Sequence, residues 1–180
     1  MGIRKWIYQA TITLPSQSDD WVVGFRECNR NSSITTVNNP DLTCQYVEAK
    51  INNQNGVCNS SPTFSVDPIG YACIAQNFSY NQGAFDADGD SLFFELINPL
   101  DDEGVNIPFI SPYTATSPMS TSTPFTFNSV TGALNFTPNL LQVGILTSRV
   151  KEYRNGVFIG SCMRDFQFNV GSCGNNDVPS

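Results

Sequence analysis

Residues 145–170 read ILTSRVKEYRNGVFIGSCMRDFQFNV, and this stretch decides the fold class. Two runs rich in β-branched and aromatic residues, over 145–153 and 157–170, flank the tripeptide Arg154-Asn-Gly156. An Asn-Gly pair between two such runs is typical of a tight β-hairpin. The sequence therefore predicts two long antiparallel strands joined at this turn.

The same strand pattern recurs along the rest of the chain, whereas the helical period of 3.6 is almost absent. Further strands are expected over 7–14, 21–25, 45–51, 76–80, 91–96, 125–127 and 133–136. A tight turn is expected at Ser129-Val-Thr-Gly132, between the strands that end at Phe127 and begin at Ala133. Short strands separated by turn signals favour β-sandwiches, so we expect an all-β protein.

The strands divide into two blocks. Residues 1–62 contain too few strands to close a sandwich, so we expect only the C-terminal part of one, with its upstream half missing. Residues 63–172 contain enough strands for a complete sandwich, and 173–180 is expected to be a linker or tail. The first residues have no apolar core of the kind found in a signal peptide, which also suggests a fragment of a longer chain.

Composition excludes several classes of function. The net charge is −7 and only three residues are lysine, which argues against nucleic-acid partners and against docking on anionic membranes. No apolar run of about 18 residues is present, so membrane insertion is not expected. The chain has no histidine, which rules out a His general base, a Ser-His-Asp triad and His-ligated metals.

Six cysteines in this acidic chain suggest disulfides, and therefore an oxidising, extracellular compartment. A zinc site is the alternative, but the closest cysteines are Cys162 and Cys173, too far apart for a Cys-x2-Cys pair. We expect Cys44–Cys58 to close a loop of about 15 residues. We also expect Cys73–Cys162, because the first and last strands of a sandwich lie side by side. Cys28 and Cys173 then pair outside this segment or with each other.

The sharpest local motif is Asp86-Ala-Asp88-Gly-Asp90. Three carboxylates at i, i+2 and i+4 gather hard oxygen ligands in one loop, as calcium requires, and without a cation they repel one another. Gly89 and Ile97 occupy the fourth and twelfth positions, so this loop is not an EF-hand. The alternative is an acidic turn with solvated aspartates.

Two further oxygen donors complete the expected calcium site. Asn59 lies in a Pro-stiffened junction with the sequence Asn59-Ser-Ser-Pro62, which either faces the aspartate loop or is an ordinary turn between domains. Glu152 precedes the Arg154-Asn-Gly156 turn and either reaches the cation or is a solvated charge at a strand end.

Catalysis is not expected. Asp101, Asp102 and Glu103 are adjacent, so they do not place two carboxyl groups across a sugar as glycoside hydrolysis requires. The thirteen Phe, six Tyr and two Trp lie mostly in strand patterns and are expected to form the core, although a carbohydrate-binding strip remains an alternative. Sequons at Asn31, Asn59, Asn77 and Asn135 are as frequent as chance predicts in so Asn-rich a chain.

Several motifs occur in a characteristic order along 6–172: YQATITLPSQSDDWVVGFRECNRNSSIT, NSSPTF, NFSYNQGAFDADGDSLFFEL, FTFNSVTGALNFTPN and VKEYRNGVFIGSCMRDFQFNV. This order resembles the large secreted and surface proteins of the Bacteroidota that carry gliding-motility-associated, type IX secretion domains. The aspartate loop alone is similar to the wider group of cadherin-like and putative Ig domains, in which linker and Asp-Ala-Asp residues share calcium.

The resemblance implies tandem Ig-like and cadherin-like sandwiches, with an incomplete Ig-like domain over 1–62 and a cadherin-like domain over 63–172. It also implies a structural or adhesive module of a secreted or cell-surface protein, stabilised by calcium. The implied partners are neighbouring domains of the same long chain, surface glycans, or further copies in a fibre. The alternatives are a lectin-like carbohydrate-binding module and a β-sandwich glycoside hydrolase.

Overall fold

The computed structural model describes residues 5–56, 58–68 and 70–174, and in this part of the chain strands dominate. Its only helical segments are two 3-10 turns, and none is long and apolar enough to cross a bilayer. The elements are β1 (Trp21–Cys28), η1 (Pro40–Leu42), β2 (Cys44–Ile51), η2 (Gln54–Gly56), β3 (Thr63–Phe64), β4 (Gly70–Cys73), β5 (Phe78–Tyr80), β6 (Ala84–Phe85), β7 (Ser91–Ile97), β8 (Leu100–Asp102), β9 (Val105–Asn106), β10 (Thr126–Phe127), β11 (Leu134–Phe136), β12 (Val143–Arg154) and β13 (Val157–Gly171).

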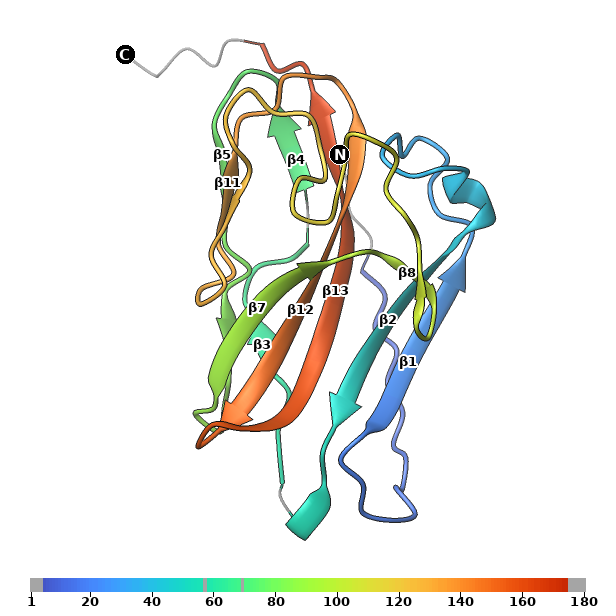
Figure 1. Ribbon diagram of the computed structural model, residues 1–180, viewed down its shortest axis with the longest axis vertical. Coiled ribbons are helices and arrows are strands. Elements are labelled where there is room, and N and C mark those ends of the chain that lie inside the picture. The colour runs from blue at the N-terminus through green and yellow to red at the C-terminus, as the bar shows by residue number, and fades with distance from the viewer. Residues whose placement is uncertain (1–4, 57, 69, 175–180) are drawn as a thin grey trace.

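The long hairpin β12–β13 is the centre of the main sheet, whose order is β7-β12-β13-β2-β8-β9 (Figure 1). Its register runs from Val143↔Asn169 to Arg154↔Val157, with an irregularity after Glu152. Asn155 and Gly156 have φ values of 52° and 79°, which is the conformation that a two-residue hairpin turn requires. The predicted hairpin is therefore confirmed.

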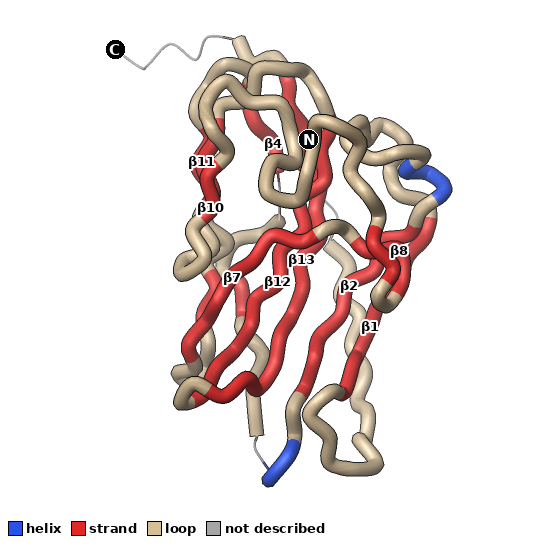
Figure 2. The backbone as a smooth tube through the Cα atoms, viewed as in Figure 1, coloured by secondary structure: helices blue, strands red, loops and turns tan. Residues whose placement is uncertain are grey.

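A small sheet of order β10-β11-β5 packs on the main sheet, and β3 pairs with β6 below it (Figure 2). The aromatic core lies between these layers. Phe136 and Phe168 are fully buried and meet edge to face at 5.7 Å, and Phe78 meets Phe168 in the same way at 5.4 Å. Phe166 and Tyr80 are also buried in this core, and Phe78, Phe125 and Phe127 pack against it half-buried. Other aromatic residues lie outside it, and Phe25 on β1 remains 43% exposed.

The two sequence blocks share one sheet. β1 pairs with β2 along its whole length, and β2 then pairs with β13 from Gly160↔Ile51 to Cys162↔Ala49. In Figure 1 this ribbon continues the main sheet beside β13. The protein is thus all-β with antiparallel sheets, but a tandem of two separate sandwiches is not confirmed.

The disulfides differ from those expected. Cys28 pairs with Cys44, and Cys73 pairs with Cys173, so the predicted bridges Cys44–Cys58 and Cys73–Cys162 are wrong. Strand register gives the reason. Cys28 and Cys44 are direct neighbours across β1 and β2, and parallel pairing sets Cys73 beside Gly171, close to Cys173. Cys58 and Cys162 remain free thiols.

Candidate metal centre

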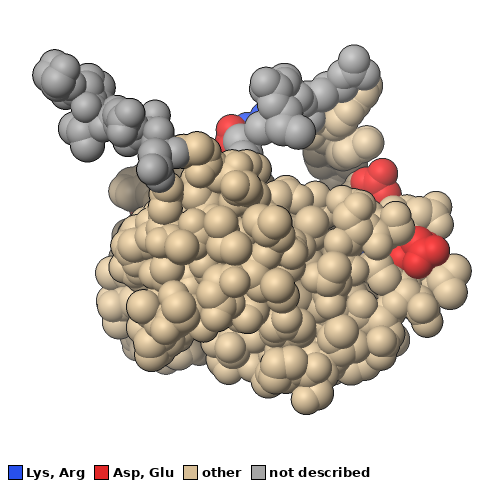
Figure 3. All heavy atoms as spheres, turned by 90° about the horizontal axis from the view of Figure 1, so that it is seen from above, with Lys and Arg blue, Asp and Glu red and all other residues tan. Residues whose placement is uncertain are grey.

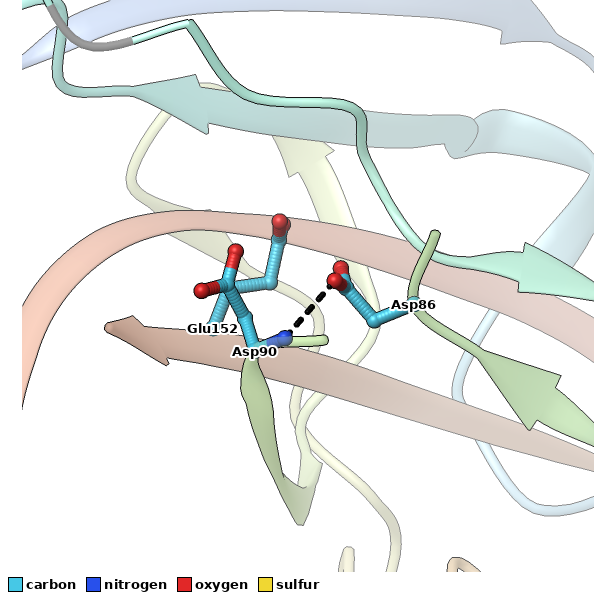
Figure 4. Close-up of side chains that lie close together, drawn as sticks. All are labelled: Asp86, Asp90 and Glu152. Atoms are coloured by element: carbon cyan, nitrogen blue, oxygen red, sulfur yellow. Dashed lines mark hydrogen bonds between the residues drawn. The ribbon is translucent and has the colours of Figure 1, made fainter. Parts of the chain in front are cut away.

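The candidate centre is a cluster of three carboxylates, defined by Asp86, Asp90 and Glu152, and called here the acidic cluster (Figure 4). One oxygen from each lies within 4.8 Å of the others. Asp86 directly follows β6, Asp90 directly precedes β7, and Glu152 is on β12, which pairs with β7. The cluster therefore forms where a short loop folds back onto the central hairpin.

Backbone hydrogen bonds fix the shape of the loop. Asp86 Oδ1 accepts the backbone N–H of Asp88 at 3.0 Å and that of Asp90 at 2.9 Å. An aspartate that accepts amides two and four residues ahead winds the chain around its own carboxylate. The i, i+2, i+4 spacing of the aspartates therefore stabilises the fold of the loop through Asp86 Oδ1. The other carboxylate oxygen of Asp86 takes no part in these two hydrogen bonds.

Two carboxylate oxygens of the acidic cluster are buried without a partner. Glu152 is fully buried and Asp86 is 7% exposed. Within the described residues, Glu152 Oε1 and Asp86 Oδ2 have no hydrogen-bond partner. The other oxygen of Glu152 accepts a hydrogen bond from Asn59 Nδ2 at 2.6 Å. Buried polar atoms are normally satisfied, so these two unpaired oxygens make the acidic cluster a candidate ligand site.

Gly160 on β13 makes room for Glu152. The two residues are paired across β12 and β13. A Cβ at Gly160 would lie 3.1 Å from Glu152 Oε1 and 3.4 Å from Asn59 Nδ2. A side chain there would fill the space next to the unpaired oxygen, so the absence of one keeps this side of the cluster open.

Arg154 is the cation that the structure places beside the cluster. Its Nε and Nη2 donate to the two oxygens of Asp90, each at 2.7 Å. The same guanidinium donates to Asn59 Oδ1 at 3.2 Å and to the Cys58 carbonyl at 3.0 Å. One guanidinium therefore offsets one of three carboxylates and ties the cluster to the segment before β3.

Burial raises the pKa of the Glu152 carboxyl, because the charged form loses its hydration. The negative charges of Asp86, Asp90 and Asp88 raise this pKa further, and the hydrogen bond from Asn59 lowers it. A cation among the carboxylates would lower the pKa of Glu152, because it would favour the charged form of the carboxyl group. The three carboxylates of the acidic cluster therefore carry more negative charge than the neighbouring Arg154 guanidinium neutralises.

The structure sorts the five predicted ligands into two groups. Asp86, Asp90 and Glu152 converge, although Asp90 also accepts two hydrogen bonds from Arg154. Asp88 and Asn59 face other partners and are not part of this group. Asp88 Oδ2 accepts the Ser60 backbone N–H at 2.6 Å and lies 3.6 Å from Arg154 Nη2. The Ser60 contact confirms that the aspartate loop meets the junction at 59–62. Asn59 faces Glu152 with its amide nitrogen, while its oxygen accepts from Arg154.

Sequence reasoning missed Arg154 and Gly160 as parts of the centre. In the sequence Arg154 is visible only as part of a turn, and no pattern marks Gly160. A hairpin turn at 155–156 leaves Arg154 at the tip but by itself would pair Glu152 with Ile159. The register shift between Glu152 and Tyr153 brings Gly160 opposite Glu152, and nothing in the sequence signals that shift.

The acids at 101–103 have a structural role. Asp101 Oδ1 accepts the Cys44 backbone N–H at 2.6 Å, and its carboxylate lies 3.5 Å from Arg26. Asp102 lies 3.7 Å from the same arginine. These contacts connect β8 to the β1–β2 ribbon.

Comparison with known proteins identifies no family. No family model matches the chain, and no curated protein does. Among solved structures, the chain is similar to a nucleoside hydrolase-related hypothetical protein from Saccharophagus degradans that is associated with carbohydrate metabolism. The TM-score is 0.38 and the identity is 16% over 63% of this chain. The match spans 26% of the length of that protein.

Proposed function

We propose that this chain is a non-catalytic structural or adhesive module of a secreted or cell-surface protein, and that calcium stabilises it at the acidic cluster. The observation that carries the proposal is the pair of buried, unpartnered oxygens on Glu152 and Asp86. A buried carboxylate without a partner is strongly destabilising, and a bound cation removes that penalty.

The residues present fit a calcium ion. Calcium takes six to eight oxygen ligands in flexible geometry, and carboxylates supply most of them. Asp86, Asp90 and Glu152 would hold the ion, with water in the remaining positions. When bound, the ion supplies positive charge that offsets the mutual repulsion of the carboxylates and joins the loop to β12. Zinc is disfavoured because the cluster offers neither thiolate nor imidazole.

Three further features support an extracellular module. Two disulfides suit an oxidising compartment, and the surface carries few charges. The face in Figure 3 is almost free of Lys, Arg, Asp and Glu side chains. A β-protein with few charged residues and two disulfides suits a surface chain of repeated domains, in which the partners are neighbouring domains.

Thermal unfolding in calcium and in chelator tests the proposal. At a hundredfold excess of free calcium over Kd, the folded state gains about 2.7 kcal/mol, which raises Tm by about 5–10 °C. Asp86→Asn should lose this gain. The control Asp41→Asn removes the same charge from an exposed residue outside the cluster and should respond as the wild type does. Identical melting of the wild type in calcium and in chelator would overturn the proposal.

A further inference from the structure

A cavity of about 470 Å³ lies beside β4 and β13. Its size is within the range of small-molecule sites, about 300–1,000 Å³. Six of its lining residues matter for recognition: Arg30, Asn31, Gln45, Tyr71, Gln167 and Asn169. None of them belongs to the acidic cluster.

The charges at the base of the cavity cancel each other. Arg30 and Asp165 form a bidentate pair with both distances at 2.8 Å, and their side chains are 5% and 2% exposed. Thr147 Oγ1 also donates to Asp165 at 3.0 Å. Because both charges are buried and satisfied, a phosphate, carboxylate or amine finds no uncompensated opposite charge here.

Amide side chains provide most of the other polar groups. Asn31 Nδ2 donates to Gln167 Oε1 at 3.3 Å, and this bond does not use the Gln167 amide nitrogen. Among the described residues, no hydrogen bond engages that nitrogen or the side chain of Asn169. Amides offer donors and acceptors together, so they suit a ligand whose hydroxyl groups do both.

An aromatic ring stands at the edge of the cavity. Tyr71 is 53% exposed, and it lies across Gly171: a Cβ there would be 2.3 Å from Tyr71 Oη and 2.9 Å from Cζ. The missing side chain thus lets the ring lie close to the strand. Apolar walls of Ile34, Ile145 and Phe166 continue from the ring into the cavity.

We propose that this cavity binds one pyranose unit of a neutral saccharide. A pyranose has an apolar C–H face, which suits Tyr71 and the aliphatic walls. Its hydroxyl groups both donate and accept, which suits Gln167, Asn169 and the side-chain oxygen of Gln45. Asn31 and the amide nitrogen of Gln45 hold this wall in place, because Asn31 bonds Gln167 and Ser33 and Gln45 Nε2 donates to the Asp165 carbonyl. The internal compensation of Arg30 by Asp165 selects against charged sugars. This binding activity goes beyond calcium stabilisation and does not depend on it.

Titration by NMR tests the proposal, because the ligand should shift the side-chain amide signals of the cavity. The probes are cellohexaose, mannohexaose and xylohexaose, with hexagalacturonate as the anionic comparison. At least one neutral probe should shift the Gln167 and Asn169 side-chain signals, with a Kd of about 1 mM or tighter. Binding should be unchanged by chelator.

Matched variants locate the binding. Tyr71→Ala and Gln167→Ala should each weaken it at least tenfold, while Tyr8→Ala, which removes an exposed ring elsewhere, should not. A two-dimensional amide spectrum of each variant confirms that it folds. The proposal is overturned if no neutral probe shifts these signals at millimolar concentration. It is also overturned if hexagalacturonate binds more tightly, or if Tyr71→Ala binds as the wild type does.

Discussion

The central hairpin carries two buried carboxylates, Asp165 and Glu152, which differ in whether their charge and their oxygens have partners. Asp165 on β13 faces Arg30 in a bidentate pair and also accepts from Thr147, so its charge and its oxygens are matched. Glu152 on β12 shares its surroundings with two more carboxylates, and one of its oxygens is unpartnered among the described residues. Asp165 connects distant parts of the fold, whereas Glu152 belongs to the cluster at which we propose that calcium binds.

The strongest test of this comparison is to break the matched pair. Asp165→Asn leaves Arg30 buried without its counter-charge, and removing one partner of a buried pair costs about 3–5 kcal/mol. Urea unfolding should show this loss equally in calcium and in chelator. The double variant Arg30→Met/Asp165→Leu removes both charges and should recover part of the loss. If Asp165→Asn unfolds at the wild-type midpoint, the pair does not hold the β1–β2 ribbon to the sandwich.

Glu152→Gln should have a smaller effect, and one that depends on calcium. The variant should lose most of the calcium stabilisation, about 2.7 kcal/mol at a hundredfold excess over Kd. In chelator it should be at least as stable as the wild type, because one of three repelling charges is gone. Paired urea titrations measure both values. Glu95→Gln, on the same sheet but paired with Arg149 and Lys151, is the control and should retain the calcium response.

Asp88→Ala should matter least to the calcium site. From sequence, the three aspartates are equivalent ligands, so this variant is expected to abolish the calcium response. In the structure Asp88 instead accepts from Ser60, and losing one such hydrogen bond costs about 1 kcal/mol. We therefore expect a small loss that is equal in calcium and in chelator. Loss of the calcium response would show that the loop rearranges around the ion.

The features that sequence predicted are local ones. The β12–β13 hairpin follows from two alternating runs and an Asn-Gly turn, and these lie within a few residues of each other. The aspartate loop is likewise contained in five residues. Its convergence on Glu152 was one of two alternatives that the sequence left open, the other being a solvated charge at a strand end.

The features that sequence missed depend on pairing between distant segments. The register Gly160↔Ile51 places β2 in the main sheet, and nothing in either segment alone specifies that partner. The parallel pairing of β4 with β13 decides the bridge of Cys73 to Cys173. Arg30 and Asp165 are 135 residues apart, so their pairing is visible only in the folded chain.

The two free cysteines, Cys58 and Cys162, allow the region around Glu152 and Asp165 to be probed with the smallest expected effect on stability. Cys162 lies on β13 between Gly160, opposite Glu152, and Asp165. Burial raises its pKa to about 12, and the charge of Glu152 adds to this effect. Cys58 is exposed. Near pH 8.5, the usual pKa of a thiol, Cys162 is therefore almost entirely protonated.

Thiol labelling with a disulfide reagent should then modify one cysteine rapidly and the other only when the sheet opens. Cys58→Ser should remove the rapid phase, because thiolate is the reactive form and Cys162 is mostly protonated. Calcium should slow the remaining phase if the acidic cluster holds β12 to the aspartate loop, and Glu152→Gln should abolish that slowing. Rapid reaction of two thiols in the folded wild type would contradict the protection of Cys162 within β13.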